Sequence, residues 1–225
     1  MSDGDATADE ATDWAFETEF ADVLEAVPDE HYDPDQFVPG VGPLSADVML
    51  VGEAPGGQEV TQGEPFVGQA GKQLDRALES IGYDRRDCYI TNLVKVRPPE
   101  NRDPHVDEIE AWWPVLEAEI ERVDPTVLVP MGSFATAEIL DTDETITDLH
   151  GREFEREVPR TSDSSSSAEQ SSADSRAAKP RDDGDEPRER DGRLVIPSFH
   201  PAAALYDRSK VDAIESDLEA ALEKA

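Results

Sequence analysis

The sequence predicts an α/β protein: a three-layer α/β/α domain built on a central, mostly parallel four-stranded sheet. Two observations support this fold class. Short apolar runs alternate along the chain with longer segments whose apolar residues recur at helical spacing, an alternation typical of parallel sheets covered by helices. Polar or glycine-rich residues follow each apolar run, at the place where such sheets bind ligands, beyond the carboxyl ends of their strands.

The first elements lead into a glycine-rich stretch. Residues 1–12 are acidic and rich in small residues, which predicts a disordered tail, and we expect a single domain over residues 13–225. Asp13–Val27 has apolar residues at helical spacing and predicts an amphipathic helix. Ala46–Val51 predicts the first strand. It runs into Leu50–Gly71, which carries a glutamate at the strand exit, six glycines and two prolines.

The later elements continue the same alternation. Gly68–Ile81 predicts a helix that ends before Gly82, and Cys88–Val94 predicts the second strand. Further helices are expected at Asp107–Val123, Phe134–Leu140 and Val211–Lys224, and further strands at Thr126–Pro130 and Leu194–Pro197. Ser133 is placed to cap the helix that follows it, and Pro201 suits the first turn of a helical segment.

Residues 161–190 differ in composition from the rest of the chain. They are rich in Ser, Asp and Arg and contain no aromatic residue and no aliphatic residue larger than alanine. Such a segment cannot bury a core, which predicts a disordered insertion. Its arginines allow a second interpretation as a flexible DNA tether. A tolerated insertion is favoured, because the acidic residues outweigh any contiguous basic patch.

The charge of the chain is strongly negative, with 53 acidic residues against 20 basic ones and a formal net charge of −33. Such a charge repels DNA in dilute salt, but it also suits a protein adapted to high salt, where repulsion is screened within about 3 Å at 1 M. The segment from Lys72 to Arg102 has seven basic residues against five acidic ones. This charge distribution, acidic overall with one basic segment, favours the interpretation of the chain as a halophilic, anion-binding enzyme.

The chain has one cysteine, Cys88. One cysteine excludes an intramolecular disulfide and any metal site made of several thiolates. The sequence also has no run of about 18 apolar residues and no basic-plus-apolar start. We therefore expect a cytoplasmic protein that does not enter a membrane.

Several motifs stand out along the chain: Gly52–Gly56 (GEAPG), Gly63–Gly71 (GEPFVGQAG), Tyr89–Asn92 (YITN), Lys95 with Arg97–Pro99 and Asn101–Arg102, and His200–Pro201. Together, in this order and spacing, they resemble the family 4 uracil-DNA glycosylases, within the uracil-DNA glycosylase superfamily. The resemblance covers roughly residues 46–206, apart from the insertion. It implies a uracil-DNA glycosylase-like fold and an enzyme that hydrolyses the N-glycosidic bond of uracil in DNA, leaving an abasic site in base excision repair. We expect uracil-containing DNA as the partner and a monomeric protein.

The resemblance assigns Phe66 and Asn92 to the uracil pocket. Phe66 would stack on a base flipped out of the duplex. Asn92 would read uracil, because its amide offers a donor for O4 and an acceptor for N3–H, a pattern that cytosine reverses. Each residue also has a plain structural interpretation, Phe66 as a core side chain and Asn92 as the polar end of a strand.

Three further residues receive roles from the resemblance. His200 would hydrogen-bond uracil O2 and stabilise the charge on the leaving base. Glu53 would position or activate water and favour the cationic sugar. Glu59 would lie beside uracil C5 and exclude the methyl group of thymine by a clash.

The remaining assignments concern the DNA strand itself. Contacts to the sugar-phosphate backbone are expected from Lys95, Arg97, Arg102, Ser133 and Arg208. Leu205 or Tyr206 is expected to act as a wedge in the minor groove that fills the space of the flipped base. The sequence leaves open which of the two is the wedge.

The sequence departs from this family at its cofactor. Family 4 enzymes typically hold a [4Fe–4S] cluster on four cysteines, whereas here the upstream region has no cysteine and the third and fourth positions are Val96 and Trp112. One cysteine cannot hold such a cluster. We therefore predict that no cofactor is bound, and that apolar packing by Val96 and Trp112, with Trp113 adding to it, takes its place.

Two other functions compete with this interpretation. A catalytically inactive, uracil- or abasic-site-binding relative would use the same pocket without turnover. An unrelated nucleotide-binding enzyme would need a phosphate loop such as G-x-x-x-x-G-K-[ST], and no such run occurs in the sequence.

Overall fold

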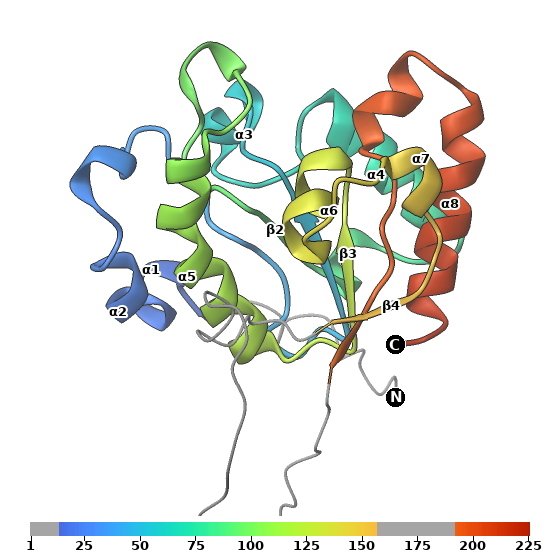
Figure 1. Cartoon of the computed structure of the whole chain (residues 1–225), viewed down its shortest axis with the longest axis horizontal. Coiled ribbons are helices and arrows are strands. Elements are labelled where there is room, and N and C mark those ends of the chain that lie inside the picture. The colour runs from blue at the N-terminus through green and yellow to red at the C-terminus, as the bar shows by residue number, and fades with distance from the viewer. Residues whose placement is uncertain (1–13, 157–191) are drawn as a thin grey trace, which may run out of the picture.

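A five-stranded sheet, in the order β2-β1-β3-β5-β4, forms the centre of the protein (Figure 1). The computed structural model describes residues 14–156 and 192–225. The predictions for residues 1–12 and 161–190 therefore lie outside the described residues. The strands are β1 (Val48–Gly52), β2 (Tyr89–Asn92), β3 (Val127–Pro130), β4 (Phe154–Arg156) and β5 (Arg193–Val195).

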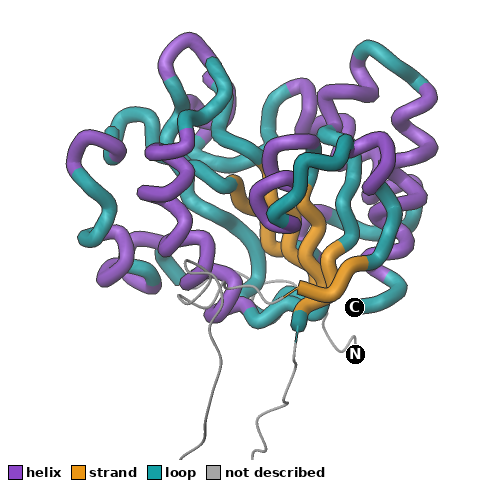
Figure 2. The backbone as a smooth tube through the Cα atoms, viewed as in Figure 1, coloured by secondary structure: helices purple, strands orange, loops and turns teal. Residues whose placement is uncertain are grey.

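Four of these strands run parallel, so their carboxyl ends meet at one edge of the sheet. Figure 2 shows the strands together, with helices on either side. The ends of β1 and β2 are in register, with Gly52 opposite Asn92. A further parallel bridge between Met131 and Ser198 extends the alignment beyond the ends of β3 and β5. Polar residues that follow each strand are thereby brought to the same edge.

The prediction of a four-stranded sheet is wrong by one strand, because the sheet of the described residues has five. β4 is an additional edge strand that pairs antiparallel with β5. It has only three residues, of which Phe154 is half-buried and both Glu155 and Arg156 are exposed. A short, charged edge strand leaves no apolar run in the sequence, because only one of its residues packs against the core.

Helices cover both faces of the sheet, which confirms the three-layer α/β/α architecture (Figure 1). One face is covered by α1 (Phe16–Glu19), α2 (Ala21–Leu24), α5 (Val106–Val123) and α6 (Ser133–Leu140), and the other by α4 (Gln69–Ser80) and α8 (Ser209–Leu222). In β1, Met49 and Val51 pack on the first face, while Val48 and Leu50 pack on the second. A strand buried on both sides explains the continuous apolar run in the sequence.

The amino-terminal region departs from prediction. Asp13–Val27 was expected to be one helix, but α1 and α2 are separated at Phe20, whose φ of −112° and ψ of 23° are not helical. Phe16 and Phe20 both pack in the core, where their ring centroids lie 4.7 Å apart.

Several short helices complete the chain. Helix α3 (Gly57–Gln62) forms inside the glycine-rich stretch, and α7 (Ile146–Leu149) precedes β4. Short 3₁₀ turns occur at η1 (Asp29–His31), η2 (Arg85–Asp87), η3 (Pro99–Asn101) and η4 (Pro201–Leu205). Ser133 is the first residue of α6 rather than its cap, a position held by Gly132. Within the described residues, no helix is both long and apolar enough to cross a membrane.

Candidate active site

Gly52, at the end of β1, is the point where Asn92 and Phe66 meet. A Cβ atom at Gly52 would lie 2.6 Å from Cζ of Phe66 and would overlap Oδ1 of Asn92. Glycine leaves this space free, so an aromatic ring and an amide can lie side by side against the strand. Both side chains are buried, with 2% of Phe66 and 3% of Asn92 exposed.

His200, which follows β5, completes this group. Its ring centroid lies 5.6 Å from that of Phe66, with an angle of 32° between the rings. Gly132 approaches so closely that a Cβ atom there would lie 2.9 Å from Cβ of His200, and its φ of +94° is one that glycine adopts readily. Phe66, Asn92 and His200 are thus brought together, with Gly52 and Gly132 making room for them.

The protonation of His200 follows from its surroundings. Burial lowers the pKa of the imidazole to about 4, so the ring is neutral at neutral pH. Its Nδ1 accepts a hydrogen bond of 3.2 Å from the backbone N–H of Ala202. A neutral ring whose Nδ1 is an acceptor carries its proton on Nε2. His200 therefore presents an uncharged hydrogen-bond donor at Nε2.

Glu53 is half-buried and lies directly after β1. Burial raises the pKa of its carboxyl group to about 7, and the negative charge of Asp103 adds to this effect. A carboxyl group with such a pKa can gain or lose a proton near neutral pH, which suits a general base. The contribution of Asp103 was not predicted, because no motif links it to Glu53.

Glu59 joins two parts of the glycine-rich stretch. Its Oε1 accepts a hydrogen bond of 2.6 Å from the backbone N–H of Phe66, and its Oε2 accepts one from the N–H of Gly56. Both oxygens of the carboxylate are therefore engaged by the backbone. The expected clash of Glu59 with the methyl group of thymine stays a prediction, and the contacts add a second role in holding Phe66.

The arrangement has a match among known proteins. The family model of the uracil DNA glycosylase superfamily matches residues 39–224. The chain belongs to this superfamily. It is also similar to proteins named type-4 uracil-DNA glycosylase. The one from Archaeoglobus fulgidus is 44% identical over 195 residues, which are 84% of this chain and 82% of the relative.

Two further type-4 relatives come from distant organisms. The one from Saccharolobus solfataricus is 35% identical over 185 residues, covering 80% of this chain and 72% of the relative. The one from Thermotoga maritima is 33% identical over 180 residues, covering 80% of this chain and 77% of the relative. The resemblance predicted from the motifs is therefore confirmed at the level of the family.

The predicted contact between Lys95 and the DNA backbone is wrong. Lys95 is 0% exposed, and its ammonium lies 2.5 Å from Oε2 of Glu119 in an ion pair with no access to solvent. It also donates a hydrogen bond of 2.8 Å to Oγ1 of Thr91. A lysine enclosed in this way cannot reach a phosphate of DNA bound at the protein surface.

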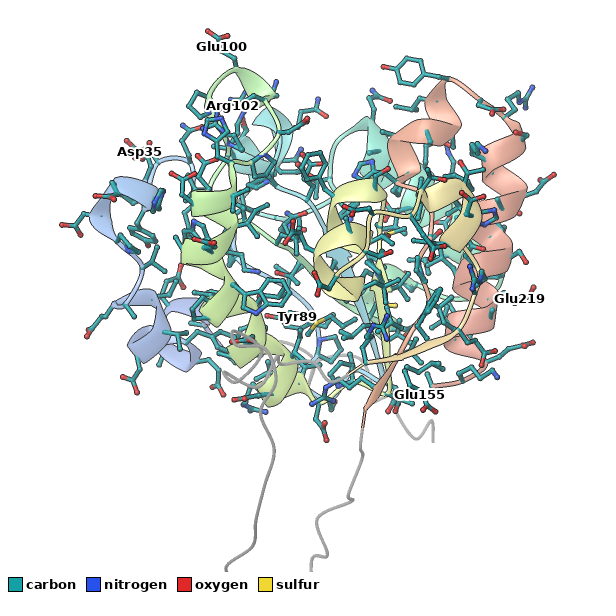
Figure 3. All side chains as sticks on the ribbon, viewed as in Figure 1. Asp35, Tyr89, Glu100, Arg102, Glu155 and Glu219 are labelled. Carbon is teal, nitrogen blue, oxygen red and sulfur yellow. The ribbon has the colours of Figure 1, made fainter. Side chains whose placement is uncertain are left out.

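Two other predicted DNA contacts, Arg97 and Arg102, lie in the segment between β2 and α5. Nε of Arg97 donates a 2.7 Å hydrogen bond to Oδ1 of Asn101, and the guanidinium remains partly exposed. Arg102 donates two hydrogen bonds, of 2.6 Å and 2.8 Å, to Glu108, and these hold the pKa of that carboxyl group at about 2. Figure 3 shows Arg102 in the loop above α5, beneath Glu100 at its tip.

The segment after His200 carries the candidate wedges. Leu205 is 40% exposed and Tyr206 is 91% exposed. Leu205 and Arg208 line a cavity of about 540 Å³ together with Arg76 of α4. Ser133 and Arg208 are exposed as well. All these residues remain candidates for contacts with a DNA strand.

The residues of this chain do not fit the iron-sulfur cluster that the type-4 resemblance implies. Cys88 is 0% exposed, packs in the core on the α4–α8 face, and has a thiol pKa that burial raises to about 12. Within the described residues, no three His, Cys, Asp or Glu side chains gather in a way that could hold a metal. A cluster that needs four thiolates has no ligand set here.

Aromatic side chains occupy the region around Val96 and Trp112. Trp112 is 0% exposed, lies 6.0 Å from Phe37 between ring centroids, and donates a hydrogen bond of 3.2 Å to the carbonyl of His31. Phe37 pairs with Val96 through an isolated backbone bridge. This packing agrees with the expected apolar substitute for a cluster. The absence of a cofactor itself stays a prediction, which iron analysis of the purified protein tests.

Proposed function

We propose that the protein is a uracil-DNA glycosylase, which hydrolyses the N-glycosidic bond of uracil in DNA and leaves an abasic site. The observation that carries the proposal is that Phe66 meets Asn92 at Gly52 and the neutral His200 at its ring, in a chain that belongs to the uracil-DNA glycosylase superfamily. Relatives named type-4 uracil-DNA glycosylase, among them one that is 44% identical, support the same reaction.

Recognition begins with a base flipped out of the DNA. Phe66 stacks on the face of the pyrimidine, and the amide of Asn92 pairs with its O4 and N3–H. Cytosine has an amino group in place of O4 and an unprotonated N3, so the same amide orientation opposes its donor with a donor. Because Asn92 is buried against Phe66, a mismatched base leaves polar groups without partners, which costs about 1–3 kcal/mol for each group.

The chemical step uses His200 and Glu53. The oxygen of a water molecule bonds to C1′ of the sugar, and the C1′–N1 bond breaks. The electron pair of that bond leaves with uracil, whose negative charge accepts a hydrogen bond from Nε2–H of His200. Glu53, as a carboxylate, takes the proton of the attacking water and favours the cationic sugar in the transition state.

The DNA strand would lie over the loops at the carboxyl edge of the sheet. Arg97, Arg102, Ser133 and Arg208 supply the backbone contacts, and Leu205 or Tyr206 fills the place of the flipped base. We infer a role in base excision repair of deaminated cytosine, in the cytoplasm of a halophilic organism and as a monomer. The partly exposed Arg97 and the exposed Arg208 support DNA binding by an otherwise acidic chain.

The test incubates the protein with single- and double-stranded oligonucleotides that carry one uracil, in dilute and in molar potassium chloride. Alkali then cleaves the strand wherever the base has been released, and a cleaved product is expected. DNA binding without cleavage at any salt concentration would instead support an inactive uracil- or abasic-site-binding relative. Asn92→Asp and His200→Ala serve as controls in the same assay.

The two control variants test the assigned roles. The carboxylate of Asn92→Asp cannot donate to O4, so excision of uracil should be lost. His200→Ala removes the donor to O2 and should lower the rate by about 10²–10³, as for other donors to a developing oxyanion. A rate close to that of the unmodified protein in either variant would refute the role given to that residue.

A further inference from the structure

Phe66 has an unusual backbone conformation for an aromatic residue. Its φ of +54° lies in the left-handed region, which residues with a side chain adopt rarely. Such conformations persist only where surrounding contacts hold them, and they gather at functional sites. The ring of Phe66 is also the one that meets Asn92 and His200. Whatever holds this backbone therefore sets the position of the stacking surface.

Arg85, at the start of η2, holds the carbonyl side of this peptide. Its Nη2 donates a 2.7 Å hydrogen bond to the carbonyl of Pro65, and its Nη1 donates a 3.0 Å hydrogen bond to the carbonyl of Phe66. Asp75 of α4 accepts from the same Nη1 at 3.3 Å and so orients the guanidinium. The side chain of Arg85 is only 21% exposed. A planar fork of donors suits two neighbouring carbonyls in a way that a lysine ammonium does not.

The N–H of Phe66 is held by a different residue, and its carbonyl is also enclosed by the start of α4. Glu59 accepts from the N–H of Phe66 at 2.6 Å. Gly71, in the first turn of α4, lies so close that a Cβ atom there would overlap the carbonyl oxygen of Phe66. The N–H and the C=O of Phe66 are thus bound from opposite sides by two charged side chains. Arg85 lies outside the motifs named in the sequence analysis. The sequence alone does not distinguish it from its neighbour Arg86.

We propose that Arg85 is a positioning residue, which keeps Phe66 in its left-handed conformation so that the ring faces the flipped uracil. Arg85 does not touch the base, and its effect passes through the carbonyls of Pro65 and Phe66. This inference rests on the proposed function, because it assigns Phe66 the task of stacking. It predicts that the loop is already formed before DNA binds.

The first experiment measures hydrogen exchange in the absence of DNA. Arg85→Ala should raise the exchange of backbone amides in residues 63–71, including that of Phe66. Arg86→Ala is the matched control, since Arg86 pairs with Asp84 on the surface and its side chain is 81% exposed. The control should leave the exchange of residues 63–71 as it is in the unmodified protein. Arg85→Gln, which keeps one donor group, provides a milder variant if Arg85→Ala fails to fold.

The second experiment measures single-turnover release of uracil. Arg85→Ala should lower the rate by about ten- to a hundredfold, the range that follows from a misplaced binding surface, while its affinity for abasic product DNA stays unchanged. Arg85→Lys should resemble Arg85→Ala rather than the unmodified protein. Millimolar guanidinium, but not the same concentration of potassium, should restore part of the activity of Arg85→Ala.

The two experiments separate the inference from the proposed function. If the unmodified protein releases no uracil, the proposed function fails, while the exchange measurement still decides whether Arg85 holds the loop. If Arg85→Ala matches Arg86→Ala in both exchange and rate, the inference is overturned. A loss of rate without any change in exchange, or without rescue by guanidinium, also overturns it.

Discussion

At the scale of single residues, burial shifts the pKa values of Glu53 and His200 in opposite directions with the same result. It raises the pKa of Glu53 to about 7 and lowers that of His200 to about 4, so both neutral forms are favoured. At neutral pH His200 is an uncharged donor, while Glu53 is divided between its two forms. Because their pKa values differ in this way, His200 can serve as a fixed hydrogen-bond donor and Glu53 as a proton acceptor in the same reaction.

The pKa of Glu53 sets the expected pH dependence. The reaction needs the carboxylate, so kcat/KM should fall as the pH decreases through about 7, by a factor of ten for each pH unit below it. His200 stays neutral over this range, because its pKa is about 4. The measurement is kcat/KM for uracil release between pH 5 and pH 9. Glu53→Gln should lower the rate and abolish this dependence of kcat/KM on pH. A flat pH profile in the unmodified protein would contradict the role of Glu53.

The same shift makes a prediction for stability. Glu53 has a higher pKa when folded than the ordinary value of 4.5, so folding favours its protonated form. This contribution to stability is fully present below about pH 4.5 and is lost as the pH rises through about 7. Glu53→Gln should therefore unfold at a higher temperature than the unmodified protein at pH 8, and at a similar temperature at pH 4.

At the scale of secondary structure, the buried side chains of β2 are tied to helix α5. Tyr89 and Thr91 of β2 donate hydrogen bonds of 3.0 Å and 2.8 Å to Oε1 of Glu119, which lies on α5. Figure 3 shows Tyr89 beside this helix. Lys95 pairs with the same carboxylate and donates to the backbone carbonyl of Asn92. The strand that presents Asn92 is therefore anchored by a charged network without access to water.

Removal of one partner of this buried ion pair should be severe. Lys95→Met leaves Glu119 without its counter-charge and should lower the free energy of unfolding by about 3–5 kcal/mol. The double variant Lys95→Met with Glu119→Gln should recover much of this loss. Arg122→Met is the control, since Arg122 pairs with Glu19 at the surface, where a pair contributes about 0–1 kcal/mol. Urea unfolding measures all three, and equal losses in Lys95→Met and Arg122→Met would contradict the network.

At the scale of the whole molecule, charge and layering have different consequences. The α/β/α arrangement brings Glu53, Asn92 and His200, which follow parallel strands, to one edge of the sheet, whereas the net charge of −33 acts on the entire surface. Unscreened, this charge destabilises the folded state through self-repulsion and opposes the approach of DNA. Salt in the molar range shortens the reach of both effects to about 3 Å.

Added salt should therefore stabilise the protein. The unfolding temperature, followed by circular dichroism, should rise between dilute and molar potassium chloride. Sucrose is an uncharged control for general effects of cosolutes, and it should give a smaller rise at equal osmotic strength. An unfolding temperature that does not depend on potassium chloride would show that repulsion within the acidic surface is unimportant.

The sequence by itself determined the main strands, the long helices and the meeting of Asn92 with His200, and the family resemblance added Phe66 to them. Strands buried on both faces leave continuous apolar runs, and residues at the ends of parallel strands must meet at one edge. These features depend on near neighbours in the chain or on a general rule of sheet geometry. They can therefore be predicted without knowledge of the contacts between distant segments.

Only the tertiary structure decided where individual charged and aromatic side chains lie and what they contact. Lys95 is buried rather than bound to DNA because Glu119, on another element, lies opposite it. Phe66 adopts a left-handed conformation because Glu59 and Arg85 bind its backbone from opposite sides. Glu119 and Arg85 both come from other elements of the fold, and a charge is stable in the interior only where folding supplies its counterpart.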